Sequence, residues 1–193
     1  MKKVFITLMA SLAVMMTLVS CKCTSDHQTV ETTVESIISA DRADMESTYG
    51  EYQWFETCIV LNDFLDADTT LVFEGVSNIF QVKDSTETGI DTHVISYAHL
   101  KDTSSVDVKH GFWVEDKPLN DEQINVTFAD ALEKVLATNS QKPHSKNVVL
   151  RKELGPRAAN AQYIFGNKEA QLYVDAVTGD VTDKNPVTLP DEQ

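Results

Sequence analysis

The stretch 171–181 constrains the fold most, because it alternates like a strand and then ends abruptly at a turn. In an extended chain Leu172, Val174 and Ala176 fall on one face, and the residues between them fall on the other. The motif Asp-x-x-Thr-Gly follows, in which Gly179 can adopt a positive φ and the Asp and Thr side chains can accept hydrogen bonds from nearby backbone N–H groups. The stretch therefore predicts a half-buried strand that closes in a tight turn.

A helix and two more strands are expected just before this stretch. Thr127 is a good N-cap, and an apolar stripe at helical spacing follows it, made of Phe128, Leu132, Val135 and Leu136. A strand is predicted over 148–154, and a hairpin with its turn at 166–168 leads back into the alternating stretch. One helix followed by three antiparallel strands predicts a two-layer unit, with the helix stripe packed on the sheet.

The middle of the chain predicts strands without helices between them. The strand-like runs, rich in aromatic and β-branched residues, are 52–65, 71–82, 93–100 and 106–114. Gly75 marks a possible bulge, and 85–91 is expected to be a loop. The last run alternates apolar and polar residues, which is typical of a sheet with one solvated face. Four strands at short spacing favour an antiparallel meander, because parallel strands would need helical crossovers.

We therefore predict an α+β fold, with an antiparallel β-meander followed by a helix packed on a three-stranded antiparallel sheet. The meander is expected over 51–117 and the helix-and-sheet unit over 118–185, with the polar segment 118–125 as their boundary. Apolar residues spaced like one helix face predict a short helix over about 30–40, within a tether of residues 21–50. Residues 186–193 are expected to be a tail.

Residues 1–20 have the features of a signal peptide: Lys2 and Lys3 precede an apolar stretch, and no second such stretch follows. The stretch ends in Leu-Val-Ser-Cys, which resembles the lipobox of bacterial lipoproteins. The resemblance implies cleavage before Cys21 and attachment of lipid to it, which would anchor the protein to a membrane of the bacterial cell envelope. Lys22 at the next position favours the outer membrane. The alternative is an ordinary secretory signal that carries a cysteine by coincidence.

The formal net charge of −14 argues against nucleic acid as a partner and against direct docking on anionic lipid. Of the three cysteines, Cys23 lies in the polar tether, and Cys58 lies in an apolar strand as a small buried side chain. The chain therefore has no disulfide framework.

The C-terminal pattern carries a resemblance to a known family. A helix, two strands and then Leu-Tyr-Val-Asp-Ala-Val-Thr-Gly-Asp-Val, over about 124–184, resemble a PepSY domain, whose last strand typically ends in Val-Asp-Ala-x-Thr-Gly. With the lipobox, the whole chain resembles the PepSY-like lipoproteins of Bacteroidetes-type bacteria. The resemblance implies a non-catalytic binding module, of a kind associated with inhibiting or chaperoning hydrolases, and it supplies no catalytic residues.

Two features suggest a binding surface. Basic residues concentrate within 142–157 of an otherwise acidic chain, and these are Lys142, Lys146, Arg151, Lys152 and Arg157. Such a basic island can steer an acidic envelope protein or peptide, although it can equally be a solvated face with paired acids. Trp113 falls on the polar face of its strand, as a contact residue or as the lid of a second packing layer. An alternative function is an accessory glycan-binding or assembly lipoprotein that stacks sugars on Trp54 or Trp113.

Catalysis, cofactors and metals are not expected. The chain lacks Gly-x-Ser-x-Gly, His-Glu-x-x-His and a phosphate-binding glycine loop, and its pattern gives no sign of a small-molecule ligand. Asp-x-Asp at 66–68 lacks the glycine and glutamate of a calcium loop, so it is expected to be a turn. His93, His99 and His110 can approach one another on adjacent strands, but no pair has the tight spacing typical of zinc ligands, and we expect no metal site.

Overall fold

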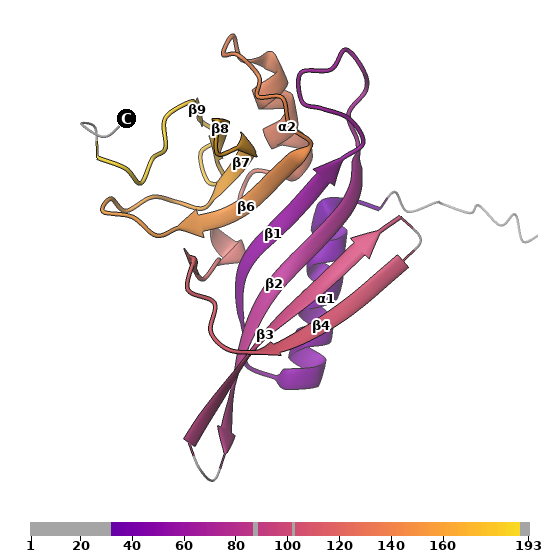
Figure 1. Cartoon of the computed structure of the whole chain (residues 1–193), viewed down its shortest axis with the longest axis vertical. Coiled ribbons are helices and arrows are strands. Elements are labelled where there is room, and N and C mark those ends of the chain that lie inside the picture. Colours follow the sequence, from indigo (N-terminus) through magenta and orange to yellow (C-terminus); the bar gives the residue numbers. More distant parts are fainter. Residues whose placement is uncertain (1–31, 87–88, 102, 190–193) are drawn as a thin grey trace, which may run out of the picture. The chain divides into compact units, whose positions relative to one another are not determined.

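The computed structural model describes residues 32–86, 89–101 and 103–189. From Thr32 onward they form one compact unit built on a single antiparallel sheet (Figure 1). The strand order is β4-β3-β2-β1-β6-β7-β8-β9, and β5 pairs with β6 beside this path. The signal peptide, the lipid attachment at Cys21 and Cys23 lie outside the described residues and stay predictions. Neither helix of the described part is long and apolar enough to cross a membrane.

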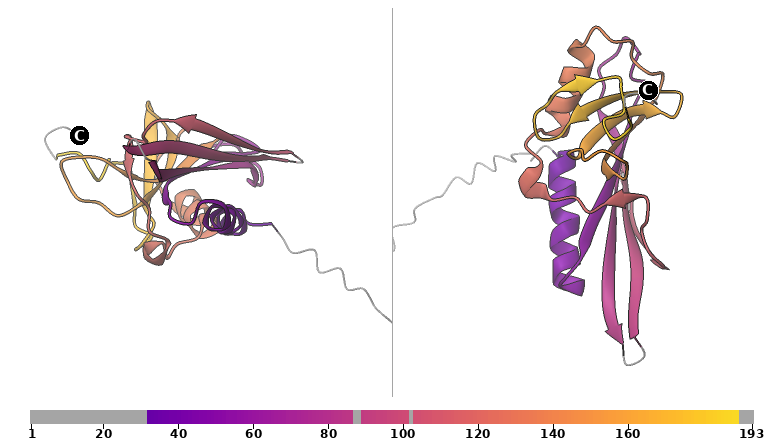
Figure 2. Two further views of the ribbon diagram at one scale, coloured as in Figure 1. Left: turned by 90° about the horizontal axis from the view of Figure 1, so that it is seen from below. Right: turned by 90° about the vertical axis from the view of Figure 1, so that its left-hand side faces the viewer.

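The strands are β1 (Gln53–Leu61), β2 (Phe73–Thr86), β3 (Gly89–Leu100), β4 (Thr103–His110), β5 (Asp116–Lys117), β6 (Asn147–Glu153), β7 (Gln162–Asn167), β8 (Ala170–Asp175) and β9 (Val181–Thr182). The helices are α1 (Val34–Tyr49), the short 3-10 helix η1 (Asp121–Gln123) and α2 (Phe128–Ala137). Both α-helices lie on the same face of the sheet (Figure 2).

The predicted α+β fold is wrong, because β6, β7 and β8 do not form a sheet of their own under α2. β6 pairs with β1 from Glu56↔Arg151 to Val60↔Asn147, so the described strands of the meander and of the C-terminal part make one nine-stranded sheet, which carries the two α-helices. The physical reason lies in β1, whose Ile59 and Leu61 have no exposed surface and whose backbone needs a partner strand on each side. This pairing joins residues about ninety positions apart, so no local pattern displays it.

The face under the helices, called the helix face, holds the main core. Its side chains include Ile59, Phe80, Ile95, Leu150 and Tyr163, and Phe128 of α2 packs on the last of these with ring centroids 6.4 Å apart. The opposite face, called the far face, carries the residues that alternate with them. Burying each large apolar side chain contributes about 1.5–3 kcal/mol, so this two-layer core accounts for much of the stability.

Helix α1 is longer than the sequence predicted, and it begins at a capping box formed by Thr33 and Ser36. Its buried stripe contains Asp41, which interrupts the apolar pattern. The apolar periodicity of the sequence therefore did not predict the second half of the helix. The Asp41 carboxylate accepts a hydrogen bond from Asn78 Nδ2 at 2.7 Å and lies 2.8 Å from His99 Nε2. These partners compensate the burial of a charged group in this position.

Helix α2 and the turn after β8 confirm the sequence reasoning. Thr127 accepts the backbone N–H of Asp130 as an N-cap, although Leu136 of the predicted stripe is exposed. After β8, one oxygen of Asp175 accepts backbone N–H groups two and three residues later, at 2.8 and 3.0 Å. Gly179 has φ 78°, in the left-handed region that a side chain disfavours.

The β2–β3 hairpin differs from its prediction. The loop expected at 85–91 is wrong, since β2 continues to Thr86 and pairs with Gly89 at the start of β3. The bulge at Gly75 is confirmed by a register shift against β1 at that point. The pairing of β1 with β2 ends at Gln81, and the pairing of β4 with β3 ends at His93. The far end of the β2–β3 hairpin therefore extends past the neighbouring strands (Figure 1). Strand β4 is exposed along its whole length, which contradicts the expected apolar face.

Candidate functional site

Arg151, one of the predicted partner-binding residues, lies in a cluster of carboxylates on the far face. The register places Glu56 directly opposite Arg151, and Asp116 opposite Glu153, so all four side chains share one face. Arg151 Nη1 is 3.9 Å from Glu56 and Nε is 3.7 Å from Asp116, and Nη2 also donates to Glu153. The guanidinium is therefore neutralised within the protein rather than offered to a partner.

Asp116 is the most deeply buried acid of this cluster. Its side chain has no exposed surface, and none of the residues that the structure describes forms a hydrogen bond with its Oδ1. Burial raises the pKa of Asp116 to about 6, and the Trp113 indole N–H and the Arg151 charge only partly oppose that rise. The cluster is thus held together by opposite charges, but it contains one carboxyl that burial favours in the neutral form.

Trp113, for which the sequence left open a contact residue or the lid of a second packing layer, lies just beyond β4 and is half-buried. Its indole N–H donates to Asp116 at 3.1 Å, and its backbone N–H donates to Gln81 at 2.8 Å. Trp54 is 4% exposed and packs in the core. Both indole N–H groups therefore have partners within the described residues.

Lys152 and Arg157 line a pocket at the end of β6. Lys117 of β5, which pairs with Lys152, joins them, and Ala158, Asn160 and Asp175 complete much of the wall. Among the described residues, none of these three cations makes an ion pair, and the pocket measures about 530 Å³. We call this group the basic pocket. Sequence reasoning missed Lys117, because the two-residue strand that carries it has no periodic pattern.

The carboxylate of Asp175, the acid that lines the basic pocket, is engaged in hydrogen bonds within the protein. It accepts two backbone N–H groups of the following turn and the side-chain amides of Asn160 and Gln162. Burial opposes ionisation, but these hydrogen bonds outweigh it and lower the pKa of Asp175 below its ordinary value. Its carboxylate is therefore held by the turn and does not pair with the three cations.

Lys146 is separate from the basic pocket. Its Nζ donates to the carbonyl oxygen of Asn62 at 2.7 Å and lies 5.5 Å from the centroid of the Phe64 ring. Lys142 donates to the carbonyl oxygen of Thr138. The basic island of the sequence is therefore divided, and only Lys152 and Arg157 come together.

The three histidines of the middle strands also divide. His99 bonds Asp41 beneath α1, as described above, whereas His93 and His110 lie side by side with ring centroids 4.4 Å apart. Asp91 completes this second group, with Oδ2 at 3.3 Å from His93 Nε2 and 3.5 Å from His110 Nδ1. Sequence reasoning did not include Asp91 in this group, because 85–91 was expected to be a loop.

Cys58 lies half-buried on the far face, with its Sγ 3.0 Å from Glu56. Burial, reinforced by the charge of Glu56, raises the pKa of the Cys58 thiol to about 12. Reactive cysteines have lowered pKa values and basic neighbours, so this environment disfavours the thiolate that a nucleophile requires.

No family model, no curated protein and no solved structure matches this chain. The PepSY-like pattern therefore remains a resemblance of residues.

Proposed function

We propose that this protein is a lipid-anchored, non-catalytic binding protein of the bacterial cell envelope, and that an acidic protein or peptide segment binds at the basic pocket. The observation that supports this most is the set of three cations, Lys117, Lys152 and Arg157, lining one pocket without ion pairs among the described residues. A chain with a formal net charge of −14 has acids in ample number, yet they do not neutralise these side chains.

Electrostatics gives this pocket a role in recognition. A cationic pocket on an acidic protein attracts an acidic segment locally while the rest of the surface repels it, which favours one orientation of approach. The envelope address rests on the lipobox-like residues that end at Cys21. The PepSY resemblance makes an envelope hydrolase the first partner class to test, with this protein as its inhibitor or chaperone.

A fluorescent peptide of alternating Glu and Gly provides a direct test of the pocket. The double variant Lys152→Glu, Arg157→Glu should bind it about tenfold more weakly at low salt, a loss of about 1.4 kcal/mol. The difference should shrink near 0.15 M salt, where screening acts beyond about 8 Å. Fluorescence anisotropy at two ionic strengths measures both.

Lys168→Glu is the matched control, because Lys168 is an exposed cation in the β7–β8 turn, at the other end of the hairpin from the pocket. It changes charge by the same kind of substitution but should leave peptide affinity almost unchanged. Equal losses in the control and pocket variants, after allowance for the number of charges, would refute binding at the pocket.

The anchor has its own test. Mass spectrometry of the mature N-terminus should show lipid on Cys21, and Cys21→Ser should abolish both the lipid and cleavage at that position. A mature chain that begins at any other residue would contradict the envelope anchor without touching the basic pocket.

A further inference from the structure

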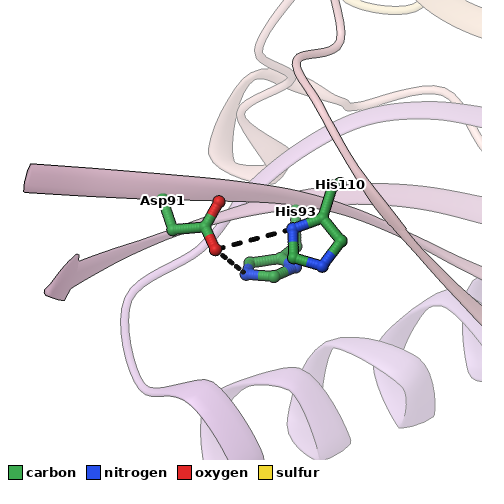
Figure 3. Close-up of side chains that lie close together, drawn as sticks. All are labelled: Asp91, His93 and His110. Carbon is green, nitrogen blue, oxygen red and sulfur yellow. Dashed lines mark ion pairs between the residues drawn. The ribbon is translucent and has the colours of Figure 1, made fainter.

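We propose that Asp91, His93 and His110 bind a divalent transition-metal ion of the zinc class. The three residues lie on β3 and β4, apart from the basic pocket, and neither the proposed binding function nor the lipid anchor requires them. Their ligand atoms all lie within 4.8 Å of one another (Figure 3).

The strand register brings these side chains to one face. Asp91 and His93 are two positions apart on β3, so they point to the same side of the sheet. His93 is directly opposite His110 in the β3–β4 ladder, and directly opposite residues also share a face. One strand therefore supplies two ligands and its neighbour supplies the third, a spacing that linear sequence motifs do not display.

The separations fit a metal ion. Zn–N and Zn–O bonds of about 2.0–2.2 Å at tetrahedral angles place neighbouring ligand atoms about 3.3–3.5 Å apart. Asp91 Oδ2 is 3.3 Å from His93 Nε2 and 3.5 Å from His110 Nδ1, so two of the three distances between ligand atoms already have this length. Tilting the exposed His110 ring toward His93 brings the nitrogens of the two histidines to the same distance, and the two rings already lie at 50° to each other.

A backbone hydrogen bond orients the Asp91 carboxylate. Asp91 Oδ1 accepts the backbone N–H of Thr92 at 2.9 Å, which leaves Oδ2 directed at the two imidazoles (Figure 3). Metal sites commonly fix their ligands through hydrogen bonds of this kind, and the loss of such partners weakens binding. Asp91 is therefore held in position before an ion arrives.

The ligand set selects the class of metal. Two imidazole nitrogens with one carboxylate suit zinc and its neighbours among the divalent transition metals, whereas magnesium and calcium prefer oxygen ligands alone. The side chain of His93 is 18% exposed and that of His110 is 78% exposed, so the site opens toward solvent. Three protein ligands leave a fourth tetrahedral position for water or for a donor from another molecule.

A bound ion would tie the end of the edge strand to its neighbour. His110 is the last residue of β4, and Gly111 follows it with φ 139° as the chain leaves the sheet. Within the described part of the chain, β4 pairs only with β3, and no described strand lies along its other edge. A metal bridge between His93 and His110 would therefore hold β4 at the point where the ladder ends.

Zinc titration of the full-length chain, followed by NMR of the histidine ring nitrogens, tests this site. Zinc should shift the ring signals of His93 and His110 at one equivalent, and magnesium at the same concentration should shift neither. His110→Ala should weaken zinc affinity at least about 100-fold by calorimetry, because removal of a ligand exceeds the 10–100-fold cost of removing a supporting group. Asp91→Asn, which preserves shape, should weaken it in the same direction.

His144→Ala is the control. His144 lies 2.9 Å from Asp66 and is exposed much as His110 is, and the described residues give this His–Asp pair no second imidazole. Its loss should leave zinc affinity unchanged. The proposal fails if zinc leaves the His93 and His110 signals in place, or if His110→Ala and Asp91→Asn both bind zinc as tightly as the wild type. The second result would assign the bound zinc to other ligands, such as the thiols near the N-terminus.

Discussion

Strands β7 and β8 are covered on both faces and β6 is half-buried on its far face, whereas β4 is exposed along its whole length at the other end of the same sheet. In β7 and β8, Tyr163 and Phe165 are buried on the helix face, while Ile164 and Tyr173 are buried on the far face. We call β6–β8 the closed end and β4, with the adjoining part of β3, the open end. One hydrogen-bonded sheet thus contains a packed core and a solvated border.

The difference follows from what covers each end. At the closed end, α2 lies on the helix face, and the chain after β9 reaches the far face, where Asn185 Nδ2 donates to Glu153 at 3.1 Å. At the open end, Val106 and Val108 are 54% and 50% exposed. Charged side chains on a short edge strand discourage pairing with other molecules, and Asp107 and Lys109 supply them here. The closed end therefore provides stability, and the open end has side chains available for ligands.

The largest effect should come from truncating the core of the closed end. Phe165 has no exposed surface, so Phe165→Ala should reduce the free energy of unfolding by about 3–5 kcal/mol. Val108→Ala at the open end should cost less than about 0.5 kcal/mol, because half of that side chain is already in water. Urea unfolding followed by circular dichroism measures both, and similar losses would remove the distinction between the two ends.

The ion pairs of the two ends should differ as well. Arg151→Met leaves three carboxylates facing one another without their cation, which should cost about 1–3 kcal/mol. Lys109→Met removes the pair with Asp107, whose two side chains are 76% and 60% exposed, and should cost less than about 0.5 kcal/mol. The same urea titrations apply. If Arg151→Met leaves the free energy of unfolding unchanged, then the carboxylates are solvated and Arg151 is available to a partner.

A smaller effect should appear in the pH dependence of stability. The folded-state pKa of Asp116, about 6, lies above its ordinary value of 3.8, so the folded protein binds this proton more tightly than the unfolded chain does. The contribution of Asp116 to stability therefore increases as the pH falls from about 6 toward 4, and it is lost as the pH rises through that window. Asp116→Asn should remove this slope.

The readout is the difference in unfolding free energy between wild type and Asp116→Asn at pH 4, 5, 6 and 7. The unfolding free energy of the wild type should increase relative to that of the variant as the pH falls, and this difference should become constant below about pH 4. Asp107→Asn, on the exposed strand β4, is the matched control and should follow the wild-type profile. A constant difference between wild type and Asp116→Asn would show that Asp116 is ionised at pH 5.

Local signals in the sequence were sufficient for individual elements. The N-cap at Thr127, the apolar stripe beginning at Phe128 and the hydrogen bonds of Asp175 all involve residues within a few positions of one another, so the sequence displays them directly. The extent of α1 was missed because Asp41 occupies a core position, and its hydrogen-bond partners Asn78 and His99 come from distant strands.

The arrangement of the sheet and the candidate sites depended on pairing at long range. Lys152 and Arg157 were recognised from their charge, but Lys117 enters the basic pocket only through the β5–β6 ladder. The metal-ligand group likewise requires the register that sets His93 opposite His110. Charge and periodicity can nominate such residues, but a pairing between separate strands decides which of them meet.

Native-state hydrogen exchange tests the contrast between the two ends most directly. Amides of β7 and β8 should exchange only through global unfolding, whereas the β4 amides bonded to β3 should exchange much faster through local opening. One equivalent of zinc should then slow exchange near His93 and His110 and leave β7 and β8 unchanged. Protection of β4 equal to that of β7 without metal would contradict the account, because the sheet would then have no open end.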